Sequence, residues 1–333
     1  MPCRPDCDAG ILTVGLNATW QRILEFDGVD MGTVNRATAC SECFAGKAQN
    51  VLRALACGGR TDAVVAQLAG GATGRRCVDD LEASGIRHET VWTEAETRVC
   101  TTVMETGTGR TTELIAPSPR VAGGPVDQLR RRLETEPCLE CLGTALCGTW
   151  PPGADVSAYL TAAARGRKRG FVVLDAWREV TPVLEQGVDI LKVNESELCE
   201  LAGEADLGSA ARACLRRYSV PCIAVTAGAR AAHLFAPNVE YTYEIAPLET
   251  VVNPIGAGDC VTAGMLAHLV PGNRAERARC TAASPLRPTV ADIAEAFRQA
   301  LAWGRASCLQ RTPSLFRIDD AQLGAIRMQR RRM

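Results

Sequence analysis

The sequence predicts an α/β fold, with a mostly parallel sheet flanked by helices and a small β-sheet lid. Short apolar runs alternate with longer helical patterns through most of the 333 residues, which indicates repeated strand–helix–strand units. Two stretches, residues 22–38 and 98–115, interrupt this alternation with β-branched residues. We expect them to add antiparallel strands that form the lid. The apolar fraction of 47% suffices for one large domain, placed at residues 9–330.

Individual elements follow from these patterns. Six apolar runs are predicted to be strands buried on both faces: Ile11–Leu16, Val64–Leu68, Thr144–Gly148, Phe171–Asp175, Asp189–Val193 and Cys222–Thr226. Six periodic segments are predicted to be helices: Val51–Cys57, Cys77–Ser84, Val126–Leu133, Val156–Arg165, Ser209–Tyr218 and Ile293–Leu309. Gly107–Gly109 should turn the lid hairpin, and Pro271–Pro288, with three prolines, should form a surface loop. In such a fold the ligand lies beyond the carboxyl ends of the strands.

Charge and targeting signals exclude several classes of protein. The net charge is −1, which provides no electrostatic footprint for nucleic acid or an anionic membrane. The arginine runs at 130–132 and 330–332 are expected to be solvated helix faces or a frayed chain end. Residues 1–8 resemble a short disordered N-terminus rather than a signal peptide. No window is long and apolar enough for a membrane helix, so we expect a cytoplasmic protein.

The sixteen cysteines are numerous for such a protein. Two Cys-x-x-Cys pairs, Cys40/Cys43 and Cys138/Cys141, leave a zinc or redox site open. The pairs are far apart, however, and only three histidines are present. Cys147, Cys222 and Cys260 lie in apolar runs, where cysteine behaves as a small hydrophobic residue. Structural thiols are therefore the favoured interpretation, and a disulfide framework is not expected without a secretory signal.

The strongest local pattern is Asn253-Pro254-Ile255-Gly256-Ala257-Gly258-Asp259, followed by an apolar segment that reads as a helix. A helix start offers unpaired N–H groups and the positive end of the helix dipole, which suit a phosphate. A carboxylate there could accept a proton from an attacking hydroxyl. The alternative is a glycine-rich cap with an ordinary first-turn aspartate. This segment alone does not decide between them.

Further motifs accompany it, and together they resemble the PfkB (ribokinase-like) family of carbohydrate kinases, in particular its 1-phosphofructokinase and tagatose-6-phosphate kinase branch. The resemblance runs from about Ile11 to residues 317–319. Six motifs occur in the order typical of the family: Leu16-Asn17 with Gly32-x-Val34-Asn35-Arg36, Ala45-Gly46-Lys47-Ala48-Gln49-Asn50, Gly148-Thr149-Trp150-Pro151-Pro152-Gly153, Lys192-Val193-Asn194-Glu195-Ser196-Glu197, Thr226-Ala227-Gly228 and Gly256-Ala257-Gly258-Asp259. Six motifs in order are far more specific than any one.

The resemblance implies a role for each matching residue. Asp259 would be the catalytic base, with Gly256, Ala257 and Gly258 forming an anion hole for the transferring phosphate. Asn17, Gly46 and Asn50 would face the sugar hydroxyls, while Lys47 and Arg98 would bind a phosphate that the substrate already carries. Asn194 and Glu197 would hold water and Mg²⁺ near ATP, and Thr226 and Gly228 would lie along the nucleotide.

Each role has an ordinary alternative. Lys47 and Arg98 could be solvated surface cations. Asn194 could be a turn residue, and Glu197 an acid in the first turn of a helix. Gly46 could simply permit an unusual backbone angle.

Several positions depart from the family pattern, and they cluster on the sugar and lid side. Gln21 replaces a sugar-binding aspartate, and we expect it to bind the substrate with an altered preference, since glutamine both donates and accepts hydrogen bonds. Ala45 and Ala48 replace glycines, Ile115 replaces a polar lid residue, and Pro254 replaces Ser or Thr. The pattern favours a shifted substrate over an inactive enzyme.

Three functions remain open. The first is an ATP-dependent kinase of a ketohexose phosphate: fructose 1-phosphate, fructose 6-phosphate or tagatose 6-phosphate. The second is a kinase of an unphosphorylated sugar or nucleoside, which the cations Lys47 and Arg98 disfavour. The third is a non-catalytic sugar-phosphate sensor, which the retained Asp259, Asn194 and Glu197 disfavour. The resemblance also implies pairing of two subunits through the lid, and hence a homodimer.

Overall fold

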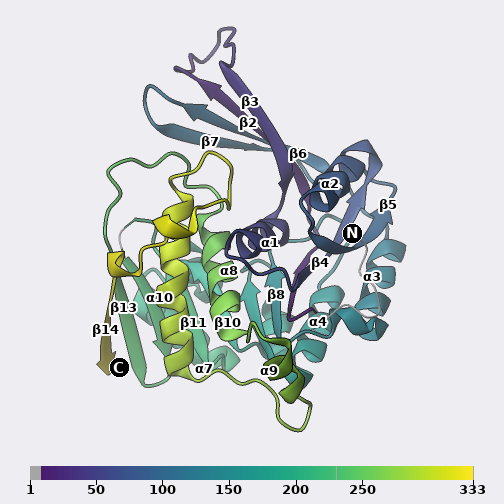
Figure 1. Ribbon diagram of the computed structural model, residues 1–333, viewed down its shortest axis with the longest axis vertical. Coiled ribbons are helices and arrows are strands. Elements are labelled where there is room, and N and C mark those ends of the chain that lie inside the picture. The colour runs from purple at the N-terminus through teal and green to yellow at the C-terminus, as the bar shows by residue number, and fades with distance from the viewer. Residues whose placement is uncertain (1–8, 230, 333) are drawn as a thin grey trace.

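The computed structural model describes residues 9–229 and 231–332, in which a ten-stranded sheet carries helices on both faces (Figure 1). The expected disordered segment 1–8 lies outside the described residues. In spatial order the strands are β14 (Ile326–Arg332), β13 (Val239–Ile245), β12 (Ala231–Ala236), β11 (Cys222–Thr226), β10 (Ile190–Asn194), β9 (Phe171–Asp175), β8 (Gly143–Cys147), β1 (Ile11–Gly15), β4 (Ala63–Gly70) and β5 (Arg87–Thr93).

In this spatial order, neighbouring strands pair in parallel from β11 through β10, β9, β8, β1 and β4 to β5. This confirms the predicted fold class. Their side chains alternate between two apolar cores: Ile11 of β1 packs in one, and Leu12 and Val14 pack in the other. Because helices cover both faces, these strands are largely apolar, except for the edge strand β5, which is mostly polar. The remaining strands, β12 to β14, pair antiparallel at one edge.

The helices divide between the two faces of the sheet. On one face lie α1 (Lys47–Cys57), α2 (Gly71–Ala83), α8 (Ala257–Leu269) and α10 (Val290–Ser307). On the other lie α3 (Gly123–Thr135), α4 (Ser157–Arg169), α5 (Thr181–Gln186), α6 (Glu195–Ala202) and α7 (Leu207–Tyr218). Within the described part of the chain, no helix combines the length and apolarity needed to cross a bilayer.

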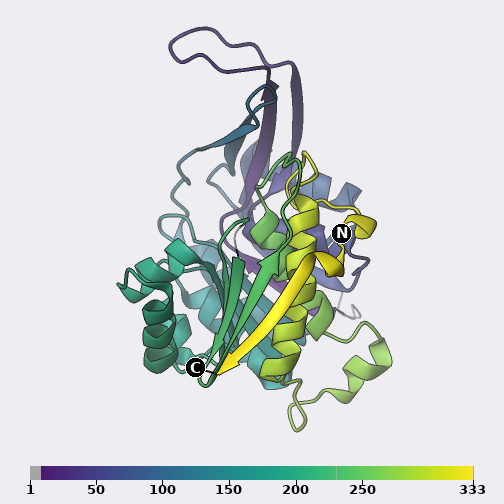
Figure 2. The ribbon, with the colours of Figure 1, turned by 90° about the vertical axis from the view of Figure 1, so that its left-hand side faces the viewer.

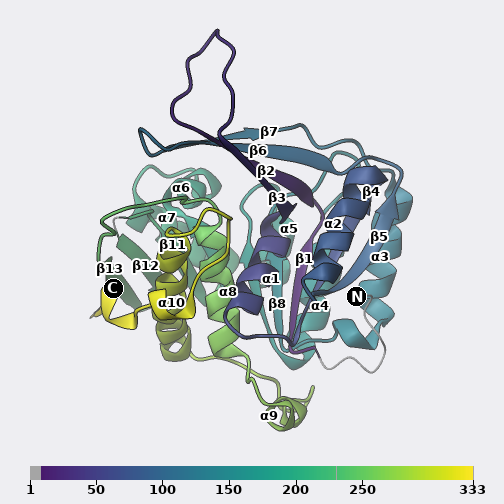
Figure 3. The same ribbon diagram turned by 45° about the horizontal axis from the view of Figure 1, so that its top comes forward.

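A second sheet, which we call the lid sheet, stands off one end of the body (Figures 1 and 3). Its strands are β3 (Ala39–Ala45), β2 (Thr19–Phe26), β6 (Arg98–Glu105) and β7 (Arg110–Ile115). The expectation of strands within 22–38 was partly wrong, because residues 27–38 form a projecting loop (Figure 2). Strand β3 lacks β-branched residues and so gave no sequence signal. The lid sheet is mixed, since β2 and β6 run parallel.

Two loop and terminus predictions also need correction. The segment 271–288 contains a short helix, α9 (Arg274–Arg279), which Asn273 caps by accepting from the backbone N–H of Ala275. Residues 330–332 are neither a helix face nor frayed, because they belong to β14. There, Arg331 lies opposite Glu240 of β13, and opposite charges across strands favour pairing.

The arginines at 130–132 lie on α3, as expected. They are more than solvated charges, because Arg130 pairs with Glu134 at 2.8 Å and Arg132 pairs with Glu89. The first pair lies within α3, and the second links the helix to β5.

Cysteines in apolar runs occupy the core. Cys147, Cys222 and Cys260 are each at most 2% exposed. Burial raises the pKa of Cys222 and of Cys260 to about 12, so both thiols stay protonated at neutral pH. These three side chains pack as small hydrophobic residues.

Candidate active site

The helix predicted after the Gly-Ala-Gly-Asp motif is α8, and Gly256 caps its N-terminus. Gly256 has φ of 80°, and a Cβ at this position would lie 2.5 Å from the Ser314 hydroxyl oxygen. Only glycine tolerates both the left-handed angle and this close approach. The turn brings Asp259 into the first turn of α8, where its side chain is 7% exposed.

The start of α8 has the donors that an anion requires. The backbone N–H groups of Gly258 and Asp259 find no acceptor among the described residues. The Lys192 ammonium lies beside them, 3.0 Å from the position that a Cβ on Gly258 would occupy. Helix N–H groups and a buried cation together favour a bound phosphate.

A buried charge cluster lies below this helix start. Asp175, at the carboxyl end of β9, is fully buried and contacts Lys47 at 2.5 Å and Lys192 at 3.3 Å. The Thr262 hydroxyl donates to Asp175 at 2.6 Å. Burial opposes ionisation of Asp175, but Lys192 and Lys47 outweigh it and lower its pKa to about 2. Burial likewise opposes the charge on Lys47, whose pKa is nevertheless raised by Asp175 and the other acids around it. The Asp175 carboxylate therefore holds both ammonium groups in place.

Asp259 titrates quite differently from Asp175. Burial raises its pKa to about 6, and Asp175 adds to this, although Lys47 and Lys192 oppose the shift. Asn50 donates to Asp259 at 2.8 Å and stabilises the ionised form. Two carboxylates in one cluster thus have pKa values pushed apart, as is common where one of them acts as a base.

A cleft of about 210 Å³ adjoins the cluster, between the lid sheet and the strand ends. It is lined by Gly15, Asn17, Lys47, Gln49, Arg98, Cys147, Gly148, Thr149, Ala176, Trp177 and Glu197. Arg98 of β6 donates to the Ser118 hydroxyl at 3.1 Å, and Ser118 donates to Asn17 at 2.9 Å. The Arg98 Nε is buried and has no acceptor among the described residues. An anion in the cleft would satisfy this guanidinium.

Asn194 and Glu197 begin helix α6. Asn194 Oδ1 accepts from the backbone N–H of Glu197 at 2.9 Å, and Glu197 Oε2 accepts from that of Asn194 at 2.8 Å. This capping box keeps the Glu197 carboxylate at the cleft, so the pair has both the ordinary helix-start role and a place in the cleft wall. Thr226 lies beside Asn194 in the register of β10 and β11. Gly228 follows in an exposed turn with φ of 62°.

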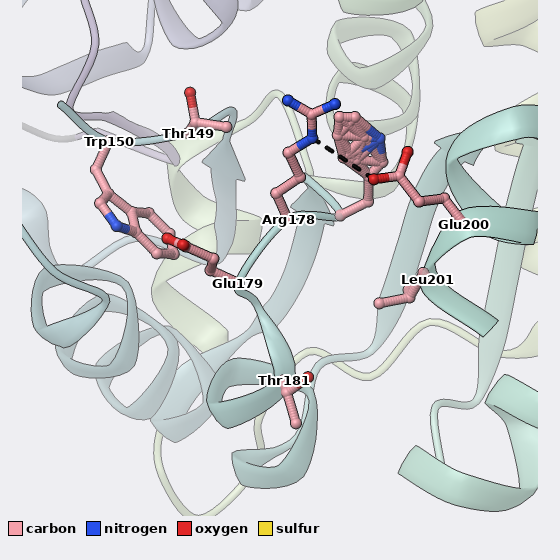
Figure 4. A pocket seen from close by; sticks show the side chains of 8 residues that line it. Thr149, Trp150, Arg178, Glu179, Thr181, Glu200 and Leu201 are labelled. Carbon is pink, nitrogen blue, oxygen red and sulfur yellow. Dashed lines mark ion pairs between the residues drawn. The ribbon is translucent and has the colours of Figure 1, made fainter. Parts of the chain in front are cut away.

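A second, larger hollow of about 480 Å³ adjoins the cleft and shares Thr149 and Trp177 with it. Figure 4 shows Trp150, Arg178, Glu179 and Glu200 around it. The Arg178 guanidinium lies 4.2 Å from the centre of a Trp177 ring and 3.7 Å from Glu200. These contacts hold Arg178 at the mouth of the hollow.

Comparison with known proteins shows the family of this chain. The family model described as pfkB family carbohydrate kinase matches residues 16–311, most of the chain. The chain belongs to this family. The carbohydrate kinase is 26% identical to tagatose-6-phosphate kinase of Staphylococcus epidermidis over 275 residues, which are 78% of this chain and 85% of the relative.

Solved structures show the same fold for this carbohydrate kinase. Phosphofructokinase-2 of Escherichia coli matches with a TM-score of 0.76 and 22% identity, covering 94% of this chain and 97% of that one. Ribokinase of Giardia lamblia matches with a TM-score of 0.71 and 18% identity, covering 94% and 98%. The described part of the chain therefore has a ribokinase-like fold, which consists of the large sheet and the small lid sheet.

The fold brings together most of the residues that the sequence predicted for this kinase. Four of them line the cleft: Asn17, Lys47, Arg98 and Glu197. Gln21 lies apart from it, because its amide donates at 2.7 Å to the Thr102 hydroxyl inside the lid sheet.

Sequence reasoning missed three residues of the buried charge cluster: Asp175, Lys192 and Thr262. Asp175 and Lys192 are charged residues within otherwise apolar runs. A buried charge is costly unless it is paired, and this could have marked them as members of a site.

Proposed function

We propose that this kinase transfers the γ-phosphate of ATP to a hydroxyl of a sugar phosphate, with a ketohexose phosphate as the acceptor class. The observation that carries this proposal is Arg98 in the cleft wall, whose buried Nε has no acceptor within the described part of the chain. A neutral sugar would leave the Nε of this guanidinium without an acceptor, whereas a phosphate could accept from the guanidinium. The named activities of the relatives, a tagatose-6-phosphate kinase and a phosphofructokinase crystallised with fructose-6-phosphate, support the same acceptor class.

In the proposed reaction, Asp259 accepts the proton of the acceptor hydroxyl as its oxygen bonds to the transferring phosphorus, and the bond from that phosphorus to ADP breaks. A pKa of about 6 leaves Asp259 mostly ionised at neutral pH and still basic enough to take the proton. The N–H groups at the start of α8 and the Lys192 ammonium compensate the charge of the phosphoryl group. Gly256, Ala257 and Gly258 let this backbone approach closely.

The residues at the cleft are compatible with a Mg²⁺ ion that is held mainly by phosphate oxygens and water. Among the described residues no group of three or more potential metal ligands occurs, but Mg²⁺ typically uses one or two carboxylates in addition to substrate phosphates. Glu197 at the cleft would supply this carboxylate, with Asn194 orienting it. The ion would neutralise phosphate charge. Thr226 and Gly228 would border the nucleotide.

The lid sheet would exclude water from the cleft, because Arg98 of β6 forms part of the cleft wall.

The outer strand β7 of the lid sheet exposes Leu114 and Ile115, which are 57% and 58% accessible. A second copy of the chain would cover these side chains in a homodimer. The replacements at Ala45, Ala48 and Pro254 would shift the choice of sugar without removing the transfer groups, whereas Gln21 hydrogen-bonds within the lid sheet.

An ADP-release assay tests this function. The panel contains fructose 1-phosphate, fructose 6-phosphate, tagatose 6-phosphate, ribose and adenosine, with the wild type beside Asp259→Asn. We expect a sugar phosphate to give the highest rate and Asp259→Asn to lower it about 100-fold or more. Asp79→Asn, an exposed change on α2, should leave the rate unchanged. A preference for ribose or adenosine would contradict the phosphate-binding role of Arg98, and ADP release no higher than in Asp259→Asn would favour a sensor.

A further inference from the structure

Gln49 contributes a buried amide to the cleft wall. It lies on α1 between Lys47 and Asn50, is 2% exposed, and lines the cleft. Its Nε2 donates to the Oε1 of Gln67 on β4 at 2.6 Å. Gln67 is itself fully buried. A buried polar side chain requires hydrogen-bond partners, and these two amides begin a longer chain.

The chain of hydrogen bonds leads from the cleft to the surface. Gln67 Nε2 lies 3.0 Å from the Thr90 hydroxyl on β5, and Thr90 lies 2.9 Å from Nδ1 of His88. Nε2 of His88 lies 3.2 Å from the carboxylate of Glu82 on α2. Five side chains from α1, β4, β5 and α2 are thus connected in series.

The outer end of this chain determines the direction of every bond. The Glu82 carboxylate is ionised and can only accept, because its hydrogen bond with His88 lowers its pKa. His88 is neutral, since burial lowers its pKa despite Glu82. Its Nε2 must therefore donate to Glu82, which leaves Nδ1 to accept from the Thr90 hydroxyl. Thr90 then accepts from Gln67.

The same logic orients the amide at the cleft. The amide nitrogen of Gln67 donates to Thr90, so its amide oxygen faces Gln49. Because this oxygen can only accept, Gln49 must donate to it through its own amide nitrogen. The oxygen of Gln49 is therefore left for the cleft side. It packs against Gly46, where a Cβ would lie only 2.4 Å from it. No donor among the described residues contacts this oxygen.

We propose that Gln49 Oε1 accepts a hydrogen bond from one hydroxyl of the acceptor sugar and is a specificity-determining contact of this kinase. Gln67, Thr90 and His88 are positioning residues, because they prevent the Gln49 amide from turning its nitrogen into the cleft. The ligand chemistry is a sugar hydroxyl, which can donate to an amide oxygen. This inference rests on the proposed function for the choice of sugars to be tested. The geometry of the hydrogen-bonded series is independent of that function.

Titration calorimetry without ATP tests the contact independently of turnover. The wild type and Gln49→Leu are titrated with the best sugar phosphate and with its monodeoxy analogues, each lacking one hydroxyl. We expect Gln49→Leu to weaken binding of the parent sugar about fivefold to tenfold. One deoxy analogue should bind both proteins equally, within about twofold, because that hydroxyl has lost its partner in either case. Each of the other analogues should still bind more weakly to Gln49→Leu than to the wild type.

The positioning role is tested with Gln67→Leu, which releases the Gln49 amide. It should weaken binding of the parent sugar less than Gln49→Leu does, and should reduce discrimination against the same deoxy analogue. A purely structural role would weaken all analogues equally. Gln128→Leu on the exposed face of α3 is the matched control, and urea unfolding of each variant verifies folding.

Three outcomes would overturn the inference. The first is a parent-sugar affinity unchanged in Gln49→Leu, and the second is an equal loss for every analogue. The third is the absence of sugar binding to the wild type. If only neutral sugars or nucleosides bind, the proposed acceptor class fails, and the same series with their deoxy forms still decides the role of Gln49.

Discussion

Asn50 and Asp259 are 209 positions apart in sequence, yet the Asn50 amide donates to the Asp259 carboxylate at 2.8 Å. Arg53 donates to the oxygen of the same amide at 3.3 Å. Because arginine can only donate, the amide nitrogen must face Asp259. The bond joins α1 to α8, so the second and the last of the six motifs meet at this point. The orientation of Asp259 therefore depends on both helices.

The pKa of Asp259 predicts how activity changes with pH. Since burial raises this pKa to about 6, the base is protonated and inactive below that value. We expect kcat/KM for the acceptor to rise about tenfold per pH unit below about 6 and to level off above about 7. Initial rates between pH 5 and 8.5 check this. Asn50→Ala removes a bond to the ionised form, so its midpoint should move upward; an unchanged midpoint would contradict the role of the amide.

The pairing of Asp175 with Lys192 predicts a stability effect. Asp175→Asn leaves the Lys192 ammonium, which is 3% exposed, without its carboxylate partner. We expect unfolding free energy to fall by roughly 3 kcal/mol, because an unpaired buried charge is strongly unfavourable. Urea unfolding measures this. The double variant Asp175→Asn/Lys192→Met should recover part of the loss, whereas additive losses would show that the two side chains are not energetically coupled.

Replacement of Arg98 should weaken binding of the acceptor sugar phosphate and leave binding of the nucleotide unchanged. Arg98 lines the cleft, and its buried Nε has no acceptor in residues 9–229 and 231–332. We expect Arg98→Ala to raise KM for the sugar phosphate about tenfold or more, since charge-assisted bonds to phosphate are strong, and to leave KM for ATP within about twofold. Steady-state kinetics with each substrate varied in turn measure both values. Arg110→Ala, an exposed change in the same sheet, is the control. Equal changes in both KM values would contradict the assignment.

The outer strand of the lid sheet predicts an effect on assembly. Leu114 and Ile115 are exposed apolar neighbours on β7. We expect Ile115→Lys to convert a homodimer into a monomer, because a buried lysine would be unpaired in the interface. Light scattering coupled to size exclusion measures the mass. Met31→Lys, in the projecting loop outside β7, should retain the dimer. A wild type that is monomeric at high concentration would refute pairing through the lid.

Much of the fold could be predicted from local patterns. Phe171–Asp175 and Cys222–Thr226 occur as strands with the bounds expected, because strands buried on both faces must be continuously apolar. Strand β3 could not be predicted, since Ala39–Ala45 has the composition of neither a typical strand nor a typical helix. Strand β14 was also missed, because an arginine-rich segment becomes a strand only when β13 is available to pair with it.

The sequence by itself determined that this chain has a parallel sheet, a glycine turn before α8 and an aspartate at the start of that helix, because apolar periodicity and backbone angles are local properties. Only the tertiary structure decided which charges meet. The contact of Lys47 with Asp175 and the hydrogen bond between Gln49 and Gln67 both depend on the packing of α1 against distant strands. The tertiary structure also raises the pKa of Asp259, because folding removes its carboxyl group from water. The sequence does not show how deeply this side chain is buried or which charges surround it.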